Sequence, residues 1–274
     1  MKLTALVAQF PVSNSIQKNL ESIHAILSQT QPGDLVVTPE GSLSGYDTDT
    51  SFLEKIDHAE LMAGKSHLQA EAAARKINLW VGACVNQEGQ WLNAAWGFLA
   101  DGRTVVYHKI NLATHERGIF TAGHHLPVFE METPGGVVKL GIQICRELRF
   151  PEQWRWLAQH GAQAFLHLNN ATGVTFPQPV WKSFLVSRAA ENQRFVLSAN
   201  NAASKQISPT LAVGPGGQVM GEIVSAEPGI LRVELDLSEI SDVYLEQRRN
   251  DVIALQSTQP NTPYDPDWDG GMEN

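Results

Sequence analysis

The chain has 274 residues, of which 43% are hydrophobic and 18% charged, so it can bury a substantial core in one large domain or two small ones. Its formal net charge of −9 argues against a surface that tracks phosphates, and we expect no nucleic-acid partner. Two cysteines, Cys84 and Cys145, give no disulfide framework and favour a reducing, cytoplasmic setting. Because no apolar run is long enough to span a bilayer and the start lacks a signal-peptide pattern, we also expect a soluble protein without a membrane partner.

Strands and helices are predicted to alternate along the chain. Short apolar runs bounded by turn residues predict strands over 3–10, 34–39, 79–84, 91–99, 104–108, 137–144, 164–168, 195–199, 211–213 and 230–235. Apolar residues at helical spacing predict helices over 15–27, 67–76, 152–160 and 181–192. Asn14 is a plausible N-cap for the first helix, and Asp101-Gly102 is a strong hairpin signal.

This alternation predicts α/β layers around a mixed sheet. No linker separates two domains, so we expect one domain over residues 1–255. The remaining residues, 256–274, form an acidic tail rich in Pro and Gly that cannot build a core of its own.

Three polar residues follow apolar strands, at points where side chains from different strands can converge on one sheet edge. They are Glu40, Lys109 and Cys145. Each one alone has an ordinary structural explanation: a solvated charge for the first two, and a small buried hydrophobe for the cysteine. Together they supply what a thiol needs for acyl transfer, namely a carboxylate to take its proton and an ammonium to hold the thiolate and an oxyanion.

Several short motifs, all in the same order, carry a resemblance to a known family. The clearest are Thr38-Pro-Glu40 with Gly45-Tyr46, Tyr107-His-Lys109-Ile-Asn-Leu112, Gly141-Ile-Gln-Ile-Cys145 and Arg149-Phe-Pro-Glu152. Weaker ones are Glu116 before Phe120-Thr-Ala-Gly123, Arg188-Ala-Ala-Glu-Asn192 and Pro215-Gly-Gly217. From residue 3 to about residue 244 the chain resembles the nitrilase superfamily of carbon–nitrogen hydrolases, in its amidase-like branch.

The resemblance implies a four-layer αββα sandwich with a Glu-Lys-Cys triad. It implies that Glu40 is the general base, Cys145 the nucleophile and Lys109 the electrostatic stabiliser. Glu116 matches the family's second glutamate, which supports the lysine or positions the substrate. The backbone N–H of Arg146 would join Lys109 in an oxyanion hole. The implied reaction converts a small amide to a carboxylic acid and ammonia through a cysteine thioester, without metal or cofactor, in a homo-oligomer of two or more subunits.

Two residues after the cysteine depart from the family's amidases, which commonly have an aromatic residue and then aspartate. Here Arg146 and Glu147 stand instead, and the glutamate is similar to nitrilases proper, so nitrile hydrolysis stays open. The Arg146 guanidinium either binds a substrate carboxylate, which would favour an ω-amide or an N-carbamoyl compound, or points away and pairs with Glu147 or another acid. Asn169 and Asn170 either contact substrate or are turn residues.

Other classes of protein have less support. A Cys–His hydrolase would need His108 or His115 to reach Cys145, but both flank the lysine motif. The adjacent His124 and His125 diverge rather than chelate, and no HExxH or CxxC occurs, so we expect no metal. A non-catalytic binding protein of the same fold is the remaining alternative, although loss of a triad member would be its expected mark.

Overall fold

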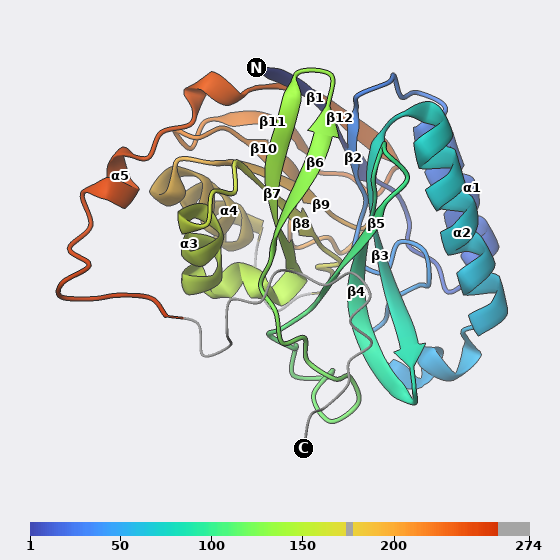
Figure 1. Cartoon of the computed structure of the whole chain (residues 1–274). Helices are drawn as coiled ribbons and strands as arrows, with labels where there is room; N and C mark the ends of the chain where they lie inside the picture. Colours follow the sequence, from blue (N-terminus) through green and yellow to red (C-terminus); the bar gives the residue numbers. More distant parts are fainter. Residues whose placement is uncertain (174–177, 257–274) are drawn as a thin grey trace.

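The computed structural model describes residues 1–173 and 178–256, and these residues form two six-stranded sheets (Figure 1). The first sheet has the order β12-β1-β2-β3-β4-β5 and the second the order β11-β10-β9-β8-β7-β6. The strands of the first are β1 (Lys2–Gln9), β2 (Leu35–Val37), β3 (Asn78–Gln87), β4 (Gln90–Phe98), β5 (Thr104–His108) and β12 (Gly229–Asp236). Those of the second are β6 (Val128–Thr133), β7 (Gly136–Ile144), β8 (Ala164–Leu168), β9 (Phe195–Ala199), β10 (Thr210–Val213) and β11 (Val219–Ile223).

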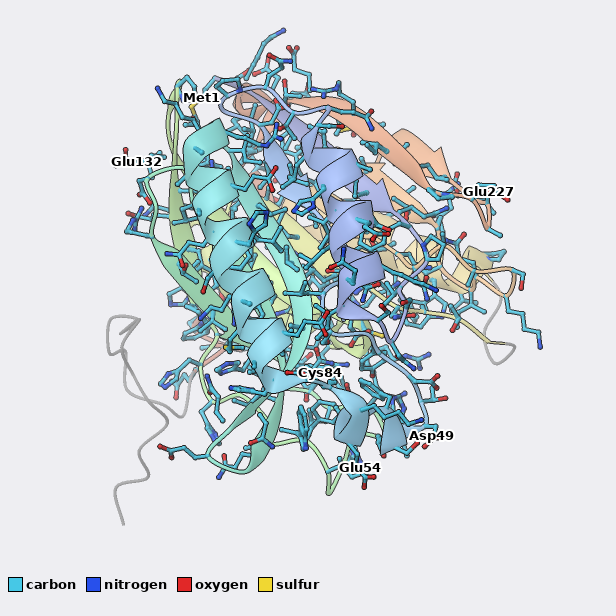
Figure 2. The ribbon with its side chains drawn as sticks, turned by 90° about the vertical axis from the view of Figure 1, so that its right-hand side faces the viewer. Met1, Asp49, Glu54, Cys84, Glu132 and Glu227 are labelled. Atoms are coloured by element: carbon cyan, nitrogen blue, oxygen red, sulfur yellow. The ribbon has the colours of Figure 1, made fainter. Side chains whose placement is uncertain are left out.

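Helices cover the outer face of each sheet, which confirms the predicted αββα sandwich. α1 (Ile16–Leu27) and α2 (His58–Arg75) cover the first sheet, and Figure 2 shows them side by side in front of it. α3 (Pro151–Gln159) and α4 (Gln178–Asn192) cover the second sheet on the opposite side of the molecule (Figure 1). The shorter helical segments are η1 (Thr50–Lys55), η2 (Cys145–Arg149), η3 (Leu237–Glu239) and α5 (Val243–Glu246).

Alternation along the inner strands explains the layers. In β1, Ala5 and Val7 face the second sheet, whereas Leu6 and Ala8 face α1 and α2. Successive side chains of a strand point to opposite faces, so a strand buried on both faces reads as a continuous apolar run. The largest cluster of buried apolar side chains therefore lies between the two sheets, and two smaller ones lie under the helices.

The strand directions bring several strand ends to one place. β1, β2 and β3 are parallel neighbours in the first sheet, and β7, β8 and β9 are parallel neighbours in the second. β5 runs parallel to β3, because each is antiparallel to β4. The carboxyl ends of β2, β3 and β5 thus share one edge of the first sheet, and this is the edge where α/β sheets build their sites.

The structure differs from the sequence-based prediction mainly at edges and helix starts. The edge strands β6 and β11 were not predicted, since their partly exposed residues and Gly221 weaken the apolar signal. α2 begins at His58 rather than residue 67, because Asp57 caps it by accepting a hydrogen bond from the Glu60 N–H. The N-cap of α1 is Ser15 and not Asn14.

Two further expectations concern the C-terminal tail and membrane-spanning helices. The predicted tail at 256–274 lies, from residue 257 onward, outside the described residues, so the division at 255 stays a prediction. Among the helices of the described part, none has both the length and the apolar character needed to cross a membrane.

Candidate active site

Glu40, Lys109 and Cys145, which lie far apart in the sequence, are brought to one site at the ends of their strands. Glu40 follows β2, Lys109 follows β5, and Cys145 begins η2 directly after β7. The Lys109 Nζ lies 2.9 Å from Glu40 Oε1 and 3.0 Å from Glu116 Oε1, and all three charged side chains are buried. An ammonium shared between two carboxylates is the arrangement that holds a buried lysine charged.

Two uncharged groups complete the network around the lysine. The Asn93 side-chain amide donates to Glu40 Oε1 and to Glu116 Oε1, at 2.8 Å in both cases. The Tyr46 hydroxyl donates to Glu116 Oε1 at 2.8 Å, and it lies 3.0 Å from His115 Nε2. Because the hydroxyl proton goes to Glu116, the His115 ring nitrogen is the donor to Tyr46. These contacts hold the two carboxylates around Lys109 in a fixed geometry.

The surroundings push the pKa values of the two carboxylates apart. Burial raises the pKa of Glu40, and Lys109 only partly offsets this effect. Burial also acts to raise the pKa of Glu116, but Lys109, the Ala113 N–H and the Asn93 amide outweigh it and lower that pKa. Burial acts to lower the pKa of Lys109, but the two carboxylates raise it overall. Glu116 therefore stays ionised, whereas Glu40 is the carboxylate that can accept and return a proton.

The backbone holds Glu40 against both sheets. Its N–H donates to the Asn169 carbonyl at 3.2 Å, which connects the end of β2 to the end of β8 in the other sheet. On its other side lies Gly82, where a Cβ would stand 2.5 Å from the Gly41 nitrogen and 2.8 Å from the Glu40 Cα. Glu40 Oε1 is engaged by Lys109 and Asn93, while Oε2 has no hydrogen-bond partner among the described residues. One carboxylate oxygen is thus free to receive a proton.

Cys145 has an unusual backbone conformation and a perturbed thiol pKa. Its φ is 46°, in the left-handed region, which costs a residue other than glycine about 1–3 kcal/mol. Burial raises the pKa of its thiol, as do the negative charges of Glu40 and Glu116, while Lys109 and the Asn170 N–H lower it. The thiol is consequently protonated at rest and needs a base to become a nucleophile.

His167 holds the backbone of Cys145. Its Nε2 lies 2.9 Å from the Cys145 carbonyl oxygen, and its Nδ1 lies 2.8 Å from the Ser198 hydroxyl. Burial lowers the pKa of His167 to about 4, so the imidazole is neutral near pH 7. A carbonyl can only accept, so Nε2 carries the proton and Nδ1 accepts from Ser198. Among the described residues no histidine forms a hydrogen bond with the Cys145 thiol. His115 contacts Tyr46, and His167 contacts the carbonyl of Cys145. His108 Nε2 is buried and has no hydrogen-bond partner in the described part of the chain.

Glu147 connects the cysteine turn to the lysine segment. Its Oε1 accepts from the Tyr107 hydroxyl at 2.7 Å and from the Ile110 and Asn111 N–H groups at 2.8 and 3.1 Å. Its Oε2 accepts from the Ile144 N–H at 2.8 Å. These bonds occupy the carboxylate and leave it no contact with Arg146, so the alternative in which the two residues pair is wrong.

The Arg146 side chain is half-buried, and among the described residues it makes no hydrogen bond or ion pair. It lies near Arg149, whose guanidinium stands over the Trp181 ring with its carbon 5.9 Å from the ring centroid. Burial lowers the pKa of Arg149, as does the charge of Arg146. Arg146 and Cys145 thus both lie near enough to Arg149 to affect its pKa.

Asn169 and Asn170 follow β8, and their backbone groups contact Glu40 and Cys145 respectively. Asn169 is fully buried, yet neither atom of its side-chain amide has a hydrogen-bond partner among the described residues. Buried amides are normally paired, so this one is a candidate ligand contact. Asn170 has a structural role: its amide lies 3.4 Å from the Glu40 carbonyl and accepts from Asn201 at 2.9 Å.

Sequence analysis did not identify Asn93, His167 or the role of Glu147. Asn93 and His167 both interrupt apolar strands, in Trp91-Leu-Asn-Ala-Ala and in Ala164-Phe-Leu-His-Leu. A polar residue in the middle of a strand buried on both faces needs a hydrogen-bond partner. Its presence in an apolar run is the feature of the sequence that could have marked both residues. The partners themselves come from other strands and could not be read from the local sequence.

Comparisons with known proteins agree with this geometry. A family model described as "Carbon-nitrogen hydrolase" matches residues 3–244. The chain is 28% identical to the omega-amidase of Danio rerio, covering 94% of this chain and 99% of that protein. It is also 28% identical to the 2-oxoglutaramate amidase of Bacillus subtilis, covering 89% and 94%.

Among solved structures, the chain is similar to a variant of the amidase from Nesterenkonia sp. AN1 that carries the acetamide moiety of fluoroacetamide on its active-site cysteine. The TM-score is 0.77 and the identity 25%, over 91% of this chain and 95% of that one. Fold, strand-end residues and family model therefore lead to the same conclusion: this chain is a member of the carbon–nitrogen hydrolase family.

Proposed function

We propose that this protein is an amidase that hydrolyses a small amide to a carboxylic acid and ammonia, with Cys145 as nucleophile. The observation that carries the proposal is the convergence of Glu40, Lys109 and Cys145 at adjoining strand ends, with one oxygen of Glu40 unengaged. The relatives named above are amidases, which favours an amide over a nitrile. The intact set of three residues argues against a non-catalytic binding protein.

The proposed mechanism has two halves, and in each of them Glu40 first accepts a proton and then donates it. Glu40 takes the thiol proton as the Cys145 sulfur attacks the amide carbon, and the carbonyl oxygen becomes an oxyanion. Lys109 and the Arg146 N–H stabilise that oxyanion; the N–H is available because the first N–H groups of a helix have no partner within it. Glu40 then protonates the leaving nitrogen, ammonia departs, and a thioester remains.

Water completes the cycle. Glu40 removes a proton from a water molecule, which attacks the thioester carbon, and the collapse of the second tetrahedral intermediate expels the Cys145 sulfur. The proton on Glu40 returns to that sulfur, the acid is released, and the enzyme is restored. Glu116, kept ionised by its neighbours, holds Lys109 charged throughout.

For the substrate class we propose an ω-amide, an amide whose far end is a carboxylate. Arg146 supports this choice, because its guanidinium is half-buried and has no partner among the described residues, and Arg149 adds a second positive charge nearby. A guanidinium binds a carboxylate with two parallel hydrogen bonds. Asn169 would contact the amide or the chain between the two groups. An N-carbamoyl compound, which also carries a carboxylate, is the second candidate.

The first test is ammonia release from ω-amides, N-carbamoyl compounds, neutral amides and nitriles. We expect turnover of at least one amide, and we expect it to be lost in Cys145→Ala and in Glu40→Gln. Cys84→Ala is the matched control, because this cysteine is fully buried in β3, and it should retain turnover. Full activity of Cys145→Ala, or ammonia from nitriles alone, would contradict the proposal.

The second test separates substrate class from reaction class. Arg146→Gln should lower kcat/KM for an ω-amide by about tenfold to a hundredfold, as expected when one charge-assisted contact is lost, and leave a neutral amide of equal length unchanged. Arg103→Gln is the control, because Arg103 is an exposed arginine that pairs with Asp101 in the distant hairpin. Equal losses on both substrates would reject the carboxylate site while leaving the amidase intact.

Assembly and location remain predictions. We propose a homodimer or larger assembly, by similarity to the family, and sedimentation at several protein concentrations would measure it. We propose a cytoplasmic location on the basis of two cysteines that are both free thiols, and fractionation of the source cells would test it.

A further inference from the structure

We infer that α1 and α2 together form a binding site for a divalent transition-metal ion such as Zn²⁺, on the outer helical layer and separate from the candidate active site. The ligands would be His24 of α1 with His67 and Glu71 of α2. One nitrogen of each imidazole and one carboxylate oxygen lie within 4.8 Å of one another. Figure 2 shows the two helices, α1 and α2, side by side.

The two distances from the carboxylate oxygen to the imidazoles are close to those between the ligands of a tetrahedral ion. His24 Nε2 lies 3.2 Å from Glu71 Oε2, and His67 Nε2 lies 3.7 Å from the same oxygen. Ligand atoms about 2.0–2.1 Å from Zn²⁺ at tetrahedral angles stand roughly 3.3–3.4 Å apart. The helix supplies part of this geometry, since His67 and Glu71 are four residues apart and project from one face of α2.

The hydrogen bonding at this cluster leaves the ligand atoms available. His24 Nε2 and Glu71 Oε2 face each other, but neither atom has a hydrogen-bond partner among the described residues. The other carboxylate oxygen, Oε1, accepts from Arg75 Nε at 2.8 Å, which fixes the carboxylate and leaves Oε2 turned towards the imidazoles. An outer partner that orients a ligand is a usual feature of metal sites.

The position in the fold also favours a cation. His24 lies in the last turn of α1, where the helix dipole is negative and attracts positive charge. Two imidazoles and a carboxylate form a donor set that suits Zn²⁺, and three protein ligands leave the fourth tetrahedral position for water. A bound ion would join α1 to α2 and raise the stability of the folded state. The alternative is that His24 and Glu71 form only an ion pair with each other and bind no metal.

Calorimetric titration of the full-length protein with ZnCl₂ distinguishes a metal site from an ion pair that binds no metal. A Cys145→Ala background removes the active-site thiol as a competing ligand. We expect one equivalent to bind, and we expect His24→Gln and His67→Gln each to weaken it by about tenfold or more. His58→Gln is the matched control, because His58 is an exposed histidine at the other end of α2, and it should bind like the parent.

Thermal unfolding gives a second, independent measurement on the same proteins. Zn²⁺ should raise the Tm of the parent and of His58→Gln and leave the Tm of the other two variants unchanged. Co²⁺ should give the visible absorption of a tetrahedral site in the parent and in His58→Gln, but not in His24→Gln or His67→Gln. Failure of the parent to bind, or equal binding by all four proteins, would overturn the inference. Neither outcome bears on the amidase proposal, since His24 and His67 lie in the helical layer and not at the strand ends.

Discussion

Replacing Glu147 by glutamine tests whether this buried carboxylate holds the lysine segment against the cysteine turn. The carboxylate accepts four hydrogen bonds of 3.1 Å or shorter, three at Oε1 and one at Oε2. A glutamine can keep its oxygen at the Oε1 position and continue to accept there. Its NH₂ group then faces the Ile144 N–H, and because both groups are donors, no hydrogen bond forms between them.

The magnitude follows from these contacts. Loss of one charge-assisted bond costs about 1.5–3 kcal/mol, and the unsatisfied buried N–H costs about 1–3 kcal/mol more. Removal of a buried charge offsets part of this cost, since burial raises the pKa of Glu147 and so disfavours its ionised form. We expect Glu147→Gln to lower the free energy of unfolding by roughly 2–4 kcal/mol. Tyr107→Phe removes one donor only and should cost about 1 kcal/mol.

Urea unfolding of the two single variants and the double variant measures the stability loss and the coupling between the two residues. We expect a coupling of about 0.5–3 kcal/mol, because the two side chains are in direct contact. Catalysis should fall as well, since Lys109 precedes the two N–H groups that Glu147 anchors. The control is Glu130→Gln, an exposed glutamate of β6 that pairs with Lys139. If Glu147→Gln unfolds at the same urea concentration as this control and keeps full kcat, the reasoning is refuted.

Three further substitutions probe the pKa of Glu40, the support of the Cys145 backbone and the loop that carries Glu40. Asn93→Ala should move the acidic limb of the kcat/KM profile to higher pH, because the Asn93 hydrogen bond lowers the pKa of Glu40; an unmoved limb would contradict this. The pKa of His167 is about 4 in the folded protein and about 6.5 when unfolded, so the unfolded state gains a proton first as the pH falls. As the pH falls from about 6.5 to about 4, the free energy of unfolding should therefore fall by about 1.4 kcal/mol per pH unit. In His167→Phe, urea unfolding at several pH values should show a dependence on pH that is smaller by this amount. Gly82→Ala places a Cβ 2.6 Å from the Pro39 carbonyl oxygen, where only backbone can yield, so we expect at least about 1–3 kcal/mol of destabilisation with a lower kcat; parent-like activity would show that the Glu40 loop tolerates displacement.

Ten of the twelve strands and the triad candidates could be predicted from the sequence. The predicted bounds of β5, β8 and β9 are those of the structure. These strands are short apolar runs bounded by polar or turn residues, a pattern that depends on neighbours in the sequence. Glu40, Lys109 and Cys145 could be selected because a polar residue just past a buried strand lies at a sheet edge. Of the four edge strands, β5 and β12 were predicted, whereas β6 and β11 were not, because exposed and partly exposed residues dilute the apolar signal in those two.

Only the tertiary structure decided how these residues are supported. Asn93 lies between Glu40 and Glu116 because β4 places it there, and His167 reaches the Cys145 carbonyl because β8 runs beside β7. The His24, His67 and Glu71 cluster likewise depends on two helices that meet side by side, although the helical spacing of the last two is visible in the sequence. Local sequence determines which residues are buried and where a strand or helix ends. Hydrogen-bond partners and ligand sets join residues far apart in the chain, so they exist only once the sheets and helices have packed.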